Sequence, residues 1–586
     1  MMTSIGKILN ICNPSEKGLQ GNHISQFSFF NFQFSITFRV IVILHFSFLI
    51  SHCFAQNSLL LRDYQFVRQQ DAWLTGSNAA GLTRYASANI AEAEVSMSLG
   101  RGGFVNYDES PKTISVDAGI ESYFRISPKT VVYGRMSYDN FTGRQMTGSA
   151  FLSPLTPQFS ILNSQFSISN TRLLPLNIVE DSLTNEGCKH RDIYQLTGAV
   201  GVDVWRGIAL GARVDYTAAN YAKYKDLRHK NKLMELTATA GASFPIARWI
   251  TVGANYRYHR SVESVTFGTY GKGDKVYKSL IDYGNFIGRV EQFGNYGFTD
   301  RSREMPLFDD GHGLDVQLST DHRPLSTFHS FSYDHRSGYY GRRSPYTITF
   351  TNHGGNHYAY YGQLSLHTSP STLHQLALRL ESEVLKNNAT TYRELKNESG
   401  SDYYEYYDDV KTGDKLQVNT TLDYSAHLGI RHELPTWTLN AALALMHRKQ
   451  TAYLYPYFRR QDIRSVGASL QCTRNVVMQR GVLSVGLMLG YLKGRGEPFE
   501  DGTFATPSDK QTSPDAMDAF LWREYLYLTA PQYSIGAHVK YAFIFPRTRL
   551  KTYTRLDVSH RKSNETNEYS NGKNHTQVSL VVGCDI

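Results

Sequence analysis

Long apolar runs are missing from most of this 586-residue chain. After the first 60 residues, no stretch reaches the roughly 18 consecutive apolar residues that a membrane-spanning helix needs. An ordinary helical membrane protein is therefore excluded. The strands of a membrane β-barrel are only half apolar, so this absence does not exclude a barrel.

Cysteine is rare, and the motifs of common enzyme classes are absent. Two of the five cysteines fall in the first 60 residues, and no C-x-x-C occurs. We interpret Cys188, Cys472 and Cys584 as small apolar residues, because three scattered cysteines form neither a disulfide framework nor a zinc site. The chain contains no G-x-S-x-G, no H-E-x-x-H and no P-loop. We expect no enzymatic activity, no cofactor and no metal site.

A strong charge of one sign is also missing. The chain has 61 basic and 52 acidic residues, a net charge of +9 that is spread along the sequence without a long basic arm. This pattern argues against nucleic acid as a partner. Tyrosine (39) and phenylalanine (31) are abundant, as is typical of strands and of aromatic girdles at membrane interfaces.

The first 55 residues are predicted to be a leader. Residues 39–50 read RVIVILHFSFLI, a basic residue followed by an apolar run too short to cross a bilayer, as in a secretory signal peptide cleaved after Ala55. Cys53 raises lipidation as an alternative, which is disfavoured by His52 where a small residue is wanted. Residues 56–89 follow as a periplasmic lead-in or a plug for the lumen.

From residue 90 onward, alternation with a period of two dominates. In IALGARVDYTA at 208–218, Ile208, Leu210, Val214 and Tyr216 alternate with small or charged residues such as Arg213 and Asp215. The same pattern recurs to the end of the chain and indicates strands rather than helices. We expect the apolar set to face lipid and the charged set to face the lumen.

The connections between these strands alternate between short and long, which predicts an all-β, antiparallel, up-and-down transmembrane β-barrel at 90–586. A soluble sandwich has no reason to separate its loops in this way. Short turns would lie in the periplasm and long loops outside the cell. We predict about 18 strands, at 90–100, 112–126, 129–142, 191–205, 208–221, 231–244, 250–264, 312–321, 326–336, 346–368, 372–386, 413–433, 437–450, 462–475, 481–496, 531–545, 548–562 and 573–586.

Charged residues on the inward face are the candidate functional residues. They carry both signs, so they either tune the selectivity of a polar channel or form a cross-strand salt-bridge network in a filled lumen. The lumen-lining candidates are Asp117, Glu121, Arg135, Asp203, Arg213, Asp215, Glu235, Arg257, Arg379, Glu381, Asp423, Lys540, Arg555 and Asp557.

The sequence resembles an uncharacterised family of Bacteroidota outer-membrane β-barrel proteins. The resemblance is carried by Trp73 with the motif SNAAGL at 77–82, by YDNF at 138–141, and by GARVDYTAANYAKYKDLRHKN at 211–231 with the two strands after it. It implies a barrel in the outer membrane, and it implies no activity and no catalytic residue.

Three functions fit this sequence. The first is a channel or transporter for small solutes. The second is a plugged barrel that takes up hydrophobic compounds through its wall, and the third is a closed barrel that displays loops for adhesion or assembly. In each case we expect a location in the cell outer membrane, with lipid, lipopolysaccharide and the barrel-assembly machinery as partners.

Overall fold

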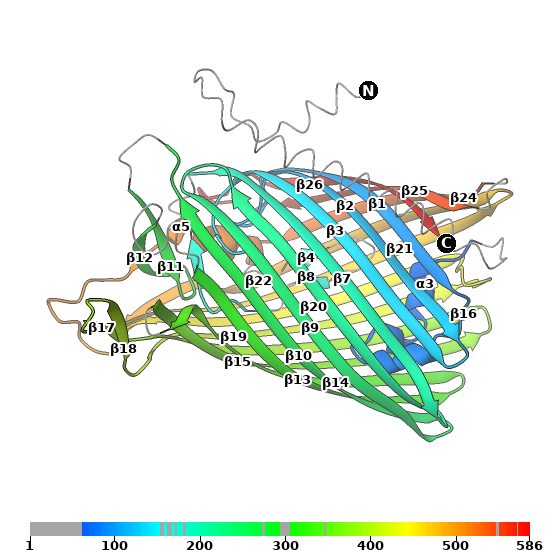
Figure 1. The fold of residues 1–586 in the computed structure, drawn as a ribbon. Helices are drawn as coiled ribbons and strands as arrows, with labels where there is room; N and C mark the ends of the chain where they lie inside the picture. Colours follow the sequence, from blue (N-terminus) through cyan, green and yellow to red (C-terminus); the bar gives the residue numbers. More distant parts are fainter. Residues whose placement is uncertain are drawn as a thin grey trace, which may run out of the picture.

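The chain forms a closed, 18-stranded antiparallel β-barrel in the computed structural model (Figure 1). The structure describes residues 61–152, 158–160, 167–169, 173–179, 183, 185–271, 276–293, 305–344, 347–545, 550–570 and 572–585. The barrel closes because its first strand pairs with its last along Glu92–Arg101 and Thr576–Asp585. The barrel strands are β1 (Ile90–Arg101), β2 (Lys112–Ser127), β3 (Thr130–Met146), β7 (Gly187–Trp205), β8 (Ile208–Lys223), β9 (Arg228–Ala247), β10 (Ile250–Gly268), β13 (Met305–His322), β14 (Leu325–Ser344), β15 (Thr347–Ser369), β16 (Thr372–Ala389), β19 (Val410–Leu428), β20 (Trp437–Leu454), β21 (Tyr457–Met478), β22 (Gly481–Thr503), β24 (Gln532–Ile544), β25 (Lys551–Ser563) and β26 (Asn574–Asp585).

The predicted fold and strand number are therefore confirmed. The largest difference lies in β13 and β14, which run over Met305–His322 and Leu325–Ser344 where 312–321 and 326–336 were predicted. Their outer halves were missed because glycine and charged residues interrupt the apolar alternation there, whereas the ladder continues to Leu307 and Tyr340.

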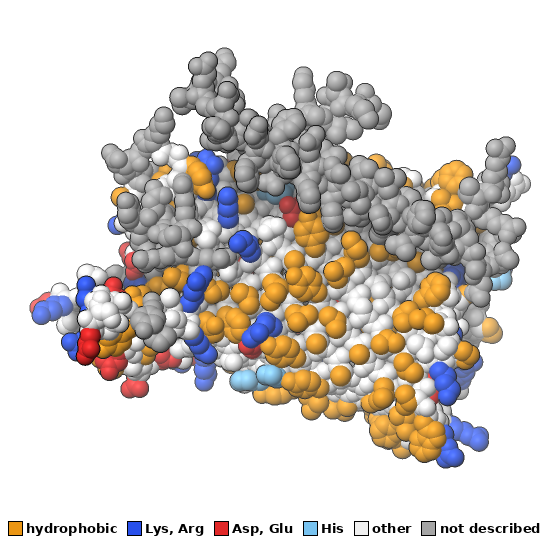
Figure 2. All heavy atoms as spheres, viewed as in Figure 1, with side chains coloured by type: hydrophobic (Ala, Val, Ile, Leu, Met, Phe, Trp, Pro, Cys, Tyr) orange, Lys and Arg blue, Asp and Glu red, His pale blue; other side chains and the backbone are white. Residues whose placement is uncertain are grey.

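The outer wall of the barrel is apolar, as the period-two pattern predicts. On β8, Leu210 and Val214 are 50% and 47% exposed, and between them Arg213 turns inward and pairs with Asp215. Figure 2 shows hydrophobic side chains spread over the visible part of the outer wall, with charged side chains gathered mainly toward the ends. The exposed large apolar side chains of the strands thus point away from the lumen, whereas a few others, such as Phe328 and Tyr123, are buried inside it.

The two ends of the barrel differ. At the short-turn end, strands are joined by tight connections such as Arg206–Gly207, and both barrel termini lie there, because Ile90 pairs with Tyr123 and Asp585 pairs with Glu92. The opposite, long-loop end carries the hairpin of β17 (Tyr392–Lys396) and β18 (Asp402–Tyr406), and β4 (Gln158–Ser160) paired with β5 (Ser167–Ser169). Short turns and long loops are thus segregated as predicted.

Residues 61–89 fold inside the barrel near the short-turn end, and we call them the plug. They form α3 (Tyr64–Gln69), α4 (Ala72–Thr75) and the 3-10 helix η1 (Ala79–Arg84). Asp63, Asp71 and Asn78 cap these helices, each accepting a hydrogen bond from a backbone N–H of its helix. The predicted leader at 1–55 and the last residue, Ile586, lie outside the described residues.

Parts of the long loops fold back into the lumen at the other end, and we call them the loop cap. The cap comprises 102–111, 147–152, 173–179, 276–293 and 515–530. It contains a four-stranded sheet of β6 (Asn177–Val179), β11 (Tyr277–Asp282), β12 (Ile287–Phe293) and β23 (Asp515–Ala516), and the helix α5 (Asp518–Thr529). Its buried core is Tyr107, Val179, Leu280, Phe286, Phe520 and Leu521, which come from four different loops.

Among the described residues, no helix combines the length and the apolar character needed to cross a membrane. Cys472 and Cys584 have free thiols. Cys188 is disulfide-bonded, so its interpretation as an unpaired apolar residue is wrong.

Candidate functional site

A polar chamber of about 760 Å³ lies inside the barrel between the plug and the wall opposite it. Plug residues such as Phe66, Trp73 and Ser77 form one side, and inward residues of β14 to β16, β19 to β22, β24 and β25 form the other. The lining includes Asn475 and Ser484, each three positions from the strand end at the turn between β21 and β22. The chamber therefore runs beside the plug from mid-barrel toward the short-turn end.

Seven of the fourteen lumen candidates line this chamber. They are Arg257, Arg379, Glu381, Asp423, Lys540, Arg555 and Asp557. Several of these charges have protein partners: Arg555 Nε lies 2.9 Å from Asp557 Oδ2, the Arg379 guanidinium stands over the Tyr361 ring, and Lys540 Nζ lies 3.8 Å from the centroid of Tyr553. Internal pairing lowers the cost of placing charges in the lumen.

The other seven candidates lie elsewhere on the inward face. Glu121 accepts a hydrogen bond from the Tyr133 hydroxyl at 2.7 Å and contacts the plug through Arg68. Of the remaining six, Asp117 accepts a hydrogen bond from Ser96, and Arg135 lies opposite Glu121 in the β2–β3 ladder. Asp203 lies beside the turn after β7. Arg213 pairs with Asp215, and Glu235 accepts a hydrogen bond from Ser261. These residues are not brought together into the chamber.

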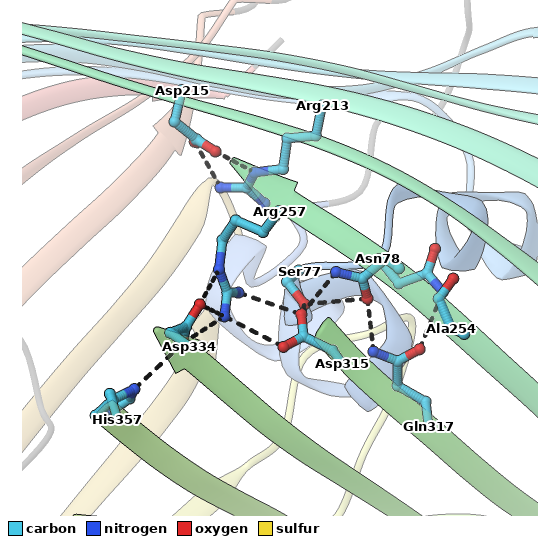
Figure 3. A network of polar contacts seen from close by, with 11 residues as sticks. Ser77, Asn78, Arg213, Asp215, Ala254, Arg257, Asp315, Gln317, Asp334 and His357 are labelled. Atoms are coloured by element: carbon cyan, nitrogen blue, oxygen red, sulfur yellow. Dashed lines mark hydrogen bonds and ion pairs between the residues drawn. The ribbon is translucent and has the colours of Figure 1, made fainter. Parts of the chain in front are cut away.

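An ion network joins the chamber wall to the plug (Figure 3). Arg257 Nη1 lies 3.2 Å from Asp315 Oδ2, and Arg257 Nη2 lies 2.7 Å from Asp334 Oδ1. The Asp315 side chain is fully buried and also accepts a hydrogen bond from the plug hydroxyl of Ser77, at 2.5 Å. His357 Nδ1 lies 3.3 Å from Asp334 Oδ2. Since a buried carboxylate needs such partners, displacing Ser77 or Arg257 leaves Asp315 undercompensated.

Asn78 fixes the plug to the wall at the same level. Its side-chain amide donates to the backbone oxygens of Ala242 and Ala254 and to Gln317 Oε1, at 3.1, 3.3 and 3.0 Å. Nearby, the Trp73 indole N–H donates to Ser319 Oγ at 2.9 Å, and its ring meets Phe328 edge-on. The SNAAGL motif that marks the resemblance is thus a docking element.

Glycines in the wall make room for that docking element. Gly201, Gly211 and Gly241 are neighbours across the β7–β8–β9 ladder. A Cβ atom at Gly211 would lie 2.1 Å from the backbone nitrogen of Ala80, and one at Gly241 would lie 2.4 Å from Asn78 Oδ1. Only glycine allows the plug backbone this close to the wall.

Both ends of the plug are tied to one turn at the rim. Arg62 Nη1 lies 3.1 Å from Glu433 Oε2, in the turn between β19 and β20. Ser87, near the other end, donates its hydroxyl to Glu433 Oε1 at 2.5 Å. Glu433 therefore contacts both the start and the end of the plug.

Buried ion pairs anchor the loop cap to the barrel wall. Arg448 of β20 pairs with Glu524 of α5 at 2.7 Å, and their side chains are 1% and 5% exposed. Glu383 of β16 pairs with Arg336 at 3.0 Å and accepts the backbone N–H of Leu173 at 2.8 Å. The cap also contacts the opposite side of the barrel, where Lys189 of β7 donates to the backbone oxygens of Thr147 and Ser149, so the cap spans the lumen rather than resting on its rim.

Two carboxyl groups of the cap lie in surroundings that favour their neutral form. Burial raises the pKa of Asp108 to about 7, with a smaller contribution from the charge of Glu109. Burial also raises the pKa of Asp282 to about 6, against the opposing effect of the Lys415 ammonium. The protonation of the cap therefore changes near neutral pH.

Sequence reasoning found charged lumen residues and missed most of the neutral ones. Asn419, Gln471 and Gln375 line the chamber and are each less than 9% exposed. The period-two pattern places them inward, but an amide on the inward face carries no signal that separates a chamber residue from any other polar residue. The cap anchors Arg448 and Glu524 were missed because the loops were expected to lie outside the lumen.

Within the described ranges, no three His, Cys, Asp or Glu side chains are arranged so that they could hold a metal ion.

Comparisons with solved structures find outer-membrane proteins at very low identity. BauA, the ferric preacinetobactin receptor from Acinetobacter baumannii, is 9% identical over 86% of this chain and 80% of its own, with a TM-score of 0.37. The outer-membrane transporter YddB from Escherichia coli is 7% identical over 85% and 81%, with a TM-score of 0.38. A mutant of the monoaromatic hydrocarbon channel TodX is 10% identical over 87% and 92%, with a TM-score of 0.29. Similarity at this level supports no inference about substrate or mechanism.

No curated protein matches the sequence. A family model described as a family of unknown function, DUF6850, matches residues 183–586, from the start of the β7 region to the C-terminal residue. The plug lies outside the matched range. Because the match covers more than half of the chain, this protein belongs to the DUF6850 family.

Proposed function

We propose that this protein is a gated outer-membrane transporter for small polar solutes. The observation that carries the proposal is the polar chamber of about 760 Å³ enclosed within a barrel whose outer wall is apolar. Sites for small molecules commonly have volumes of roughly 300–1,000 Å³. The chamber is lined by charged and hydrogen-bonding side chains, which suits polar solutes better than the hydrophobic compounds of the alternative hypothesis.

The outer wall supports the location. Apolar side chains cover it, and the large aromatic residues Trp205, Phe244 and Trp249 are 43–60% exposed around two turns at the short-turn end. Such aromatics form the girdle of outer-membrane barrels at the lipid–water interface. We place the short turns in the periplasm and the long loops outside the cell, in the outer membrane of a Bacteroidota bacterium, with lipopolysaccharide and the barrel-assembly machinery as partners.

The packing of the lumen supports a gate rather than a permanently open pore. An 18-stranded barrel is wide enough for an aqueous channel if nothing fills it. Here the loop cap occupies the lumen at the height of Glu383 and Arg448, while the chamber lies below it, beside the plug. Movement of the cap would connect the chamber to the outside.

Solute permeation into proteoliposomes tests the proposal. Glu524→Ala leaves Arg448 buried without its carboxylate, which costs about 3–5 kcal/mol and should release α5 from the wall. We expect slow permeation of small polar solutes in the wild type and faster, size-limited permeation in Glu524→Ala.

Glu500→Ala is the matched control. Glu500 lies in the same β22–β24 region, but its pair with Arg460 is 3.5 Å long and its side chain is 63% exposed, so its loss should cost about 0–1 kcal/mol. Permeation in this variant should equal that of the wild type. Equally fast permeation in all three proteins, or none in a correctly folded Glu524→Ala, would overturn the proposal.

A further inference from the structure

We propose that the chamber binds a neutral, polyhydroxylated solute, such as a short oligosaccharide. This inference rests on the proposed function and names its substrate class. More than half of the residues that line the chamber are Asn, Gln, Ser, Thr or Tyr, and these types outnumber the charged ones about two to one. Amides and hydroxyls both donate and accept hydrogen bonds, as hydroxyl groups of a solute require.

Three of the chamber's five cations, Arg68, Arg257 and Arg555, are paired with carboxylates within the protein, which argues against an anionic solute. Arg257 is held by Asp315 and Asp334, and Arg555 by Asp557. An anion would have to compete with these fixed carboxylates, at a cost in desolvation that a neutral solute does not meet.

Two side chains in the lining each carry one polar atom without a hydrogen-bond partner among the described residues. Asn419 and His427 project from the same face of β19 and are 5% and 3% exposed. Asn419 Oδ1 and His427 Nε2 are each left without a partner. Buried polar atoms are normally satisfied, so groups of this kind in a chamber wall indicate a place for solute hydroxyls or the water that precedes them.

An aromatic strip completes the lining. The Trp73 and Phe328 rings lie 5.2 Å apart, and the Phe328 and Tyr361 rings lie 6.1 Å apart. All three residues contribute to the chamber. Trp73 and Phe328 are 2% and 6% exposed, so the edge of this strip adds a small apolar contact for the C–H groups of a sugar ring.

Calorimetric titration of the detergent-solubilised protein tests this inference. We would compare maltotriose as the neutral probe with triglycine as the zwitterionic probe and inorganic phosphate as the anionic probe. We expect maltotriose to bind, and to bind more tightly than the other two. Tighter binding of triglycine or phosphate, or no binding of maltotriose, would overturn the inference.

Variants at buried amides connect binding to the chamber. Asn419→Leu should weaken maltotriose binding at least about tenfold, because a buried hydrogen-bond partner is lost. Asn387→Leu is the matched control, since Asn387 is 1% exposed, donates to Thr412 and does not line the chamber. If Asn419→Leu does not fold, Gln471→Leu on β21 makes the same test. Equal affinity in a folded chamber variant would contradict the inference.

Binding is measured without permeation, so the two proposals fail separately. A protein that binds maltotriose yet passes no solute when the cap is loosened would refute transport and keep the binding site. A protein that passes small solutes yet binds no maltotriose would refute the substrate class and keep the transporter.

Discussion

The docking of the plug depends on glycines in the wall, and replacing one of them is predicted to expel the plug without damaging the barrel. Gly211→Val places a Cβ atom 2.1 Å from the Ala80 backbone nitrogen, where ordinary contacts begin near 3.4 Å. The plug must therefore retreat by about 1.3 Å. Valine is well suited to a strand, so the ladder itself should be kept.

The magnitude follows from the contacts that this shift removes. The two N–H groups of the Asn78 amide share three acceptors at 3.0–3.3 Å, and all of these distances would stretch beyond hydrogen-bonding range. At about 1 kcal/mol for each N–H group, their loss destabilises the docked plug by about 2 kcal/mol. Since about 1.4 kcal/mol corresponds to a factor of ten, the undocked population should rise about 30-fold.

Hydrogen exchange followed by mass spectrometry is the assay. In Gly211→Val, amides of residues 72–85 should exchange about 30-fold faster, while those of the barrel strands keep their protection. Gly198→Val is the matched control, because a Cβ at Gly198 meets no atom within 4 Å. Unchanged protection of the plug in Gly211→Val, or the same loss in Gly198→Val, would refute the glycine cradle.

Two further predictions concern the wall and the cap. Val214→Arg places a charge on the outer face of β8 and should lower the free energy of unfolding in lipid bilayers by roughly 2–4 kcal/mol. Val214→Leu, the control, should have little effect. Equal stability of the two variants would contradict the assignment of the lipid face. For Asp108, the pKa of about 7 in the folded cap lies above the unfolded value of about 4, so the folded cap binds the proton more tightly. The stability that this tighter proton binding provides is fully present below about pH 4. It is lost as the pH rises to about 7, and above that pH the stability of the cap no longer changes through Asp108. Relative to the intrinsic exchange rate at each pH, cap amides should therefore be less protected at pH 8 than at pH 5, and Asp108→Asn should reduce this difference in protection; an unchanged difference in that variant would show that Asp108 is not its source.

The barrel could be predicted from sequence because its signal is local. Alternation as in Leu210, Arg213, Val214 and Asp215 is set by the pleat of a strand and by the solvents on its two sides, and both are present within one strand. The strand number followed from repeating this pattern between turns. The outer halves of β13 and β14 were not predicted, because glycines such as Gly311 and Gly338 weaken the alternation there.

The arrangement of the lumen could not be predicted in the same way. The docking motif SNAAGL was recognised as a feature of the sequence, but its partners Gly211 and Gly241 become neighbours only once β8 and β9 are in register. The pair between Arg448 and Glu524 joins residues 76 positions apart through a loop that folds inward. Such contacts depend on tertiary packing, which carries no periodicity in the sequence.

Single-channel conductance in a planar bilayer tests most directly whether the loop cap gates a chamber for solutes. The wild-type protein is predicted to insert with little steady conductance, and Glu524→Ala is predicted to show frequent openings that Glu500→Ala does not share. A large, steady conductance of the wild type would show that the cap does not close the lumen. No conductance from the membrane-inserted Glu524→Ala variant would show that releasing α5 from the wall opens no path through the barrel.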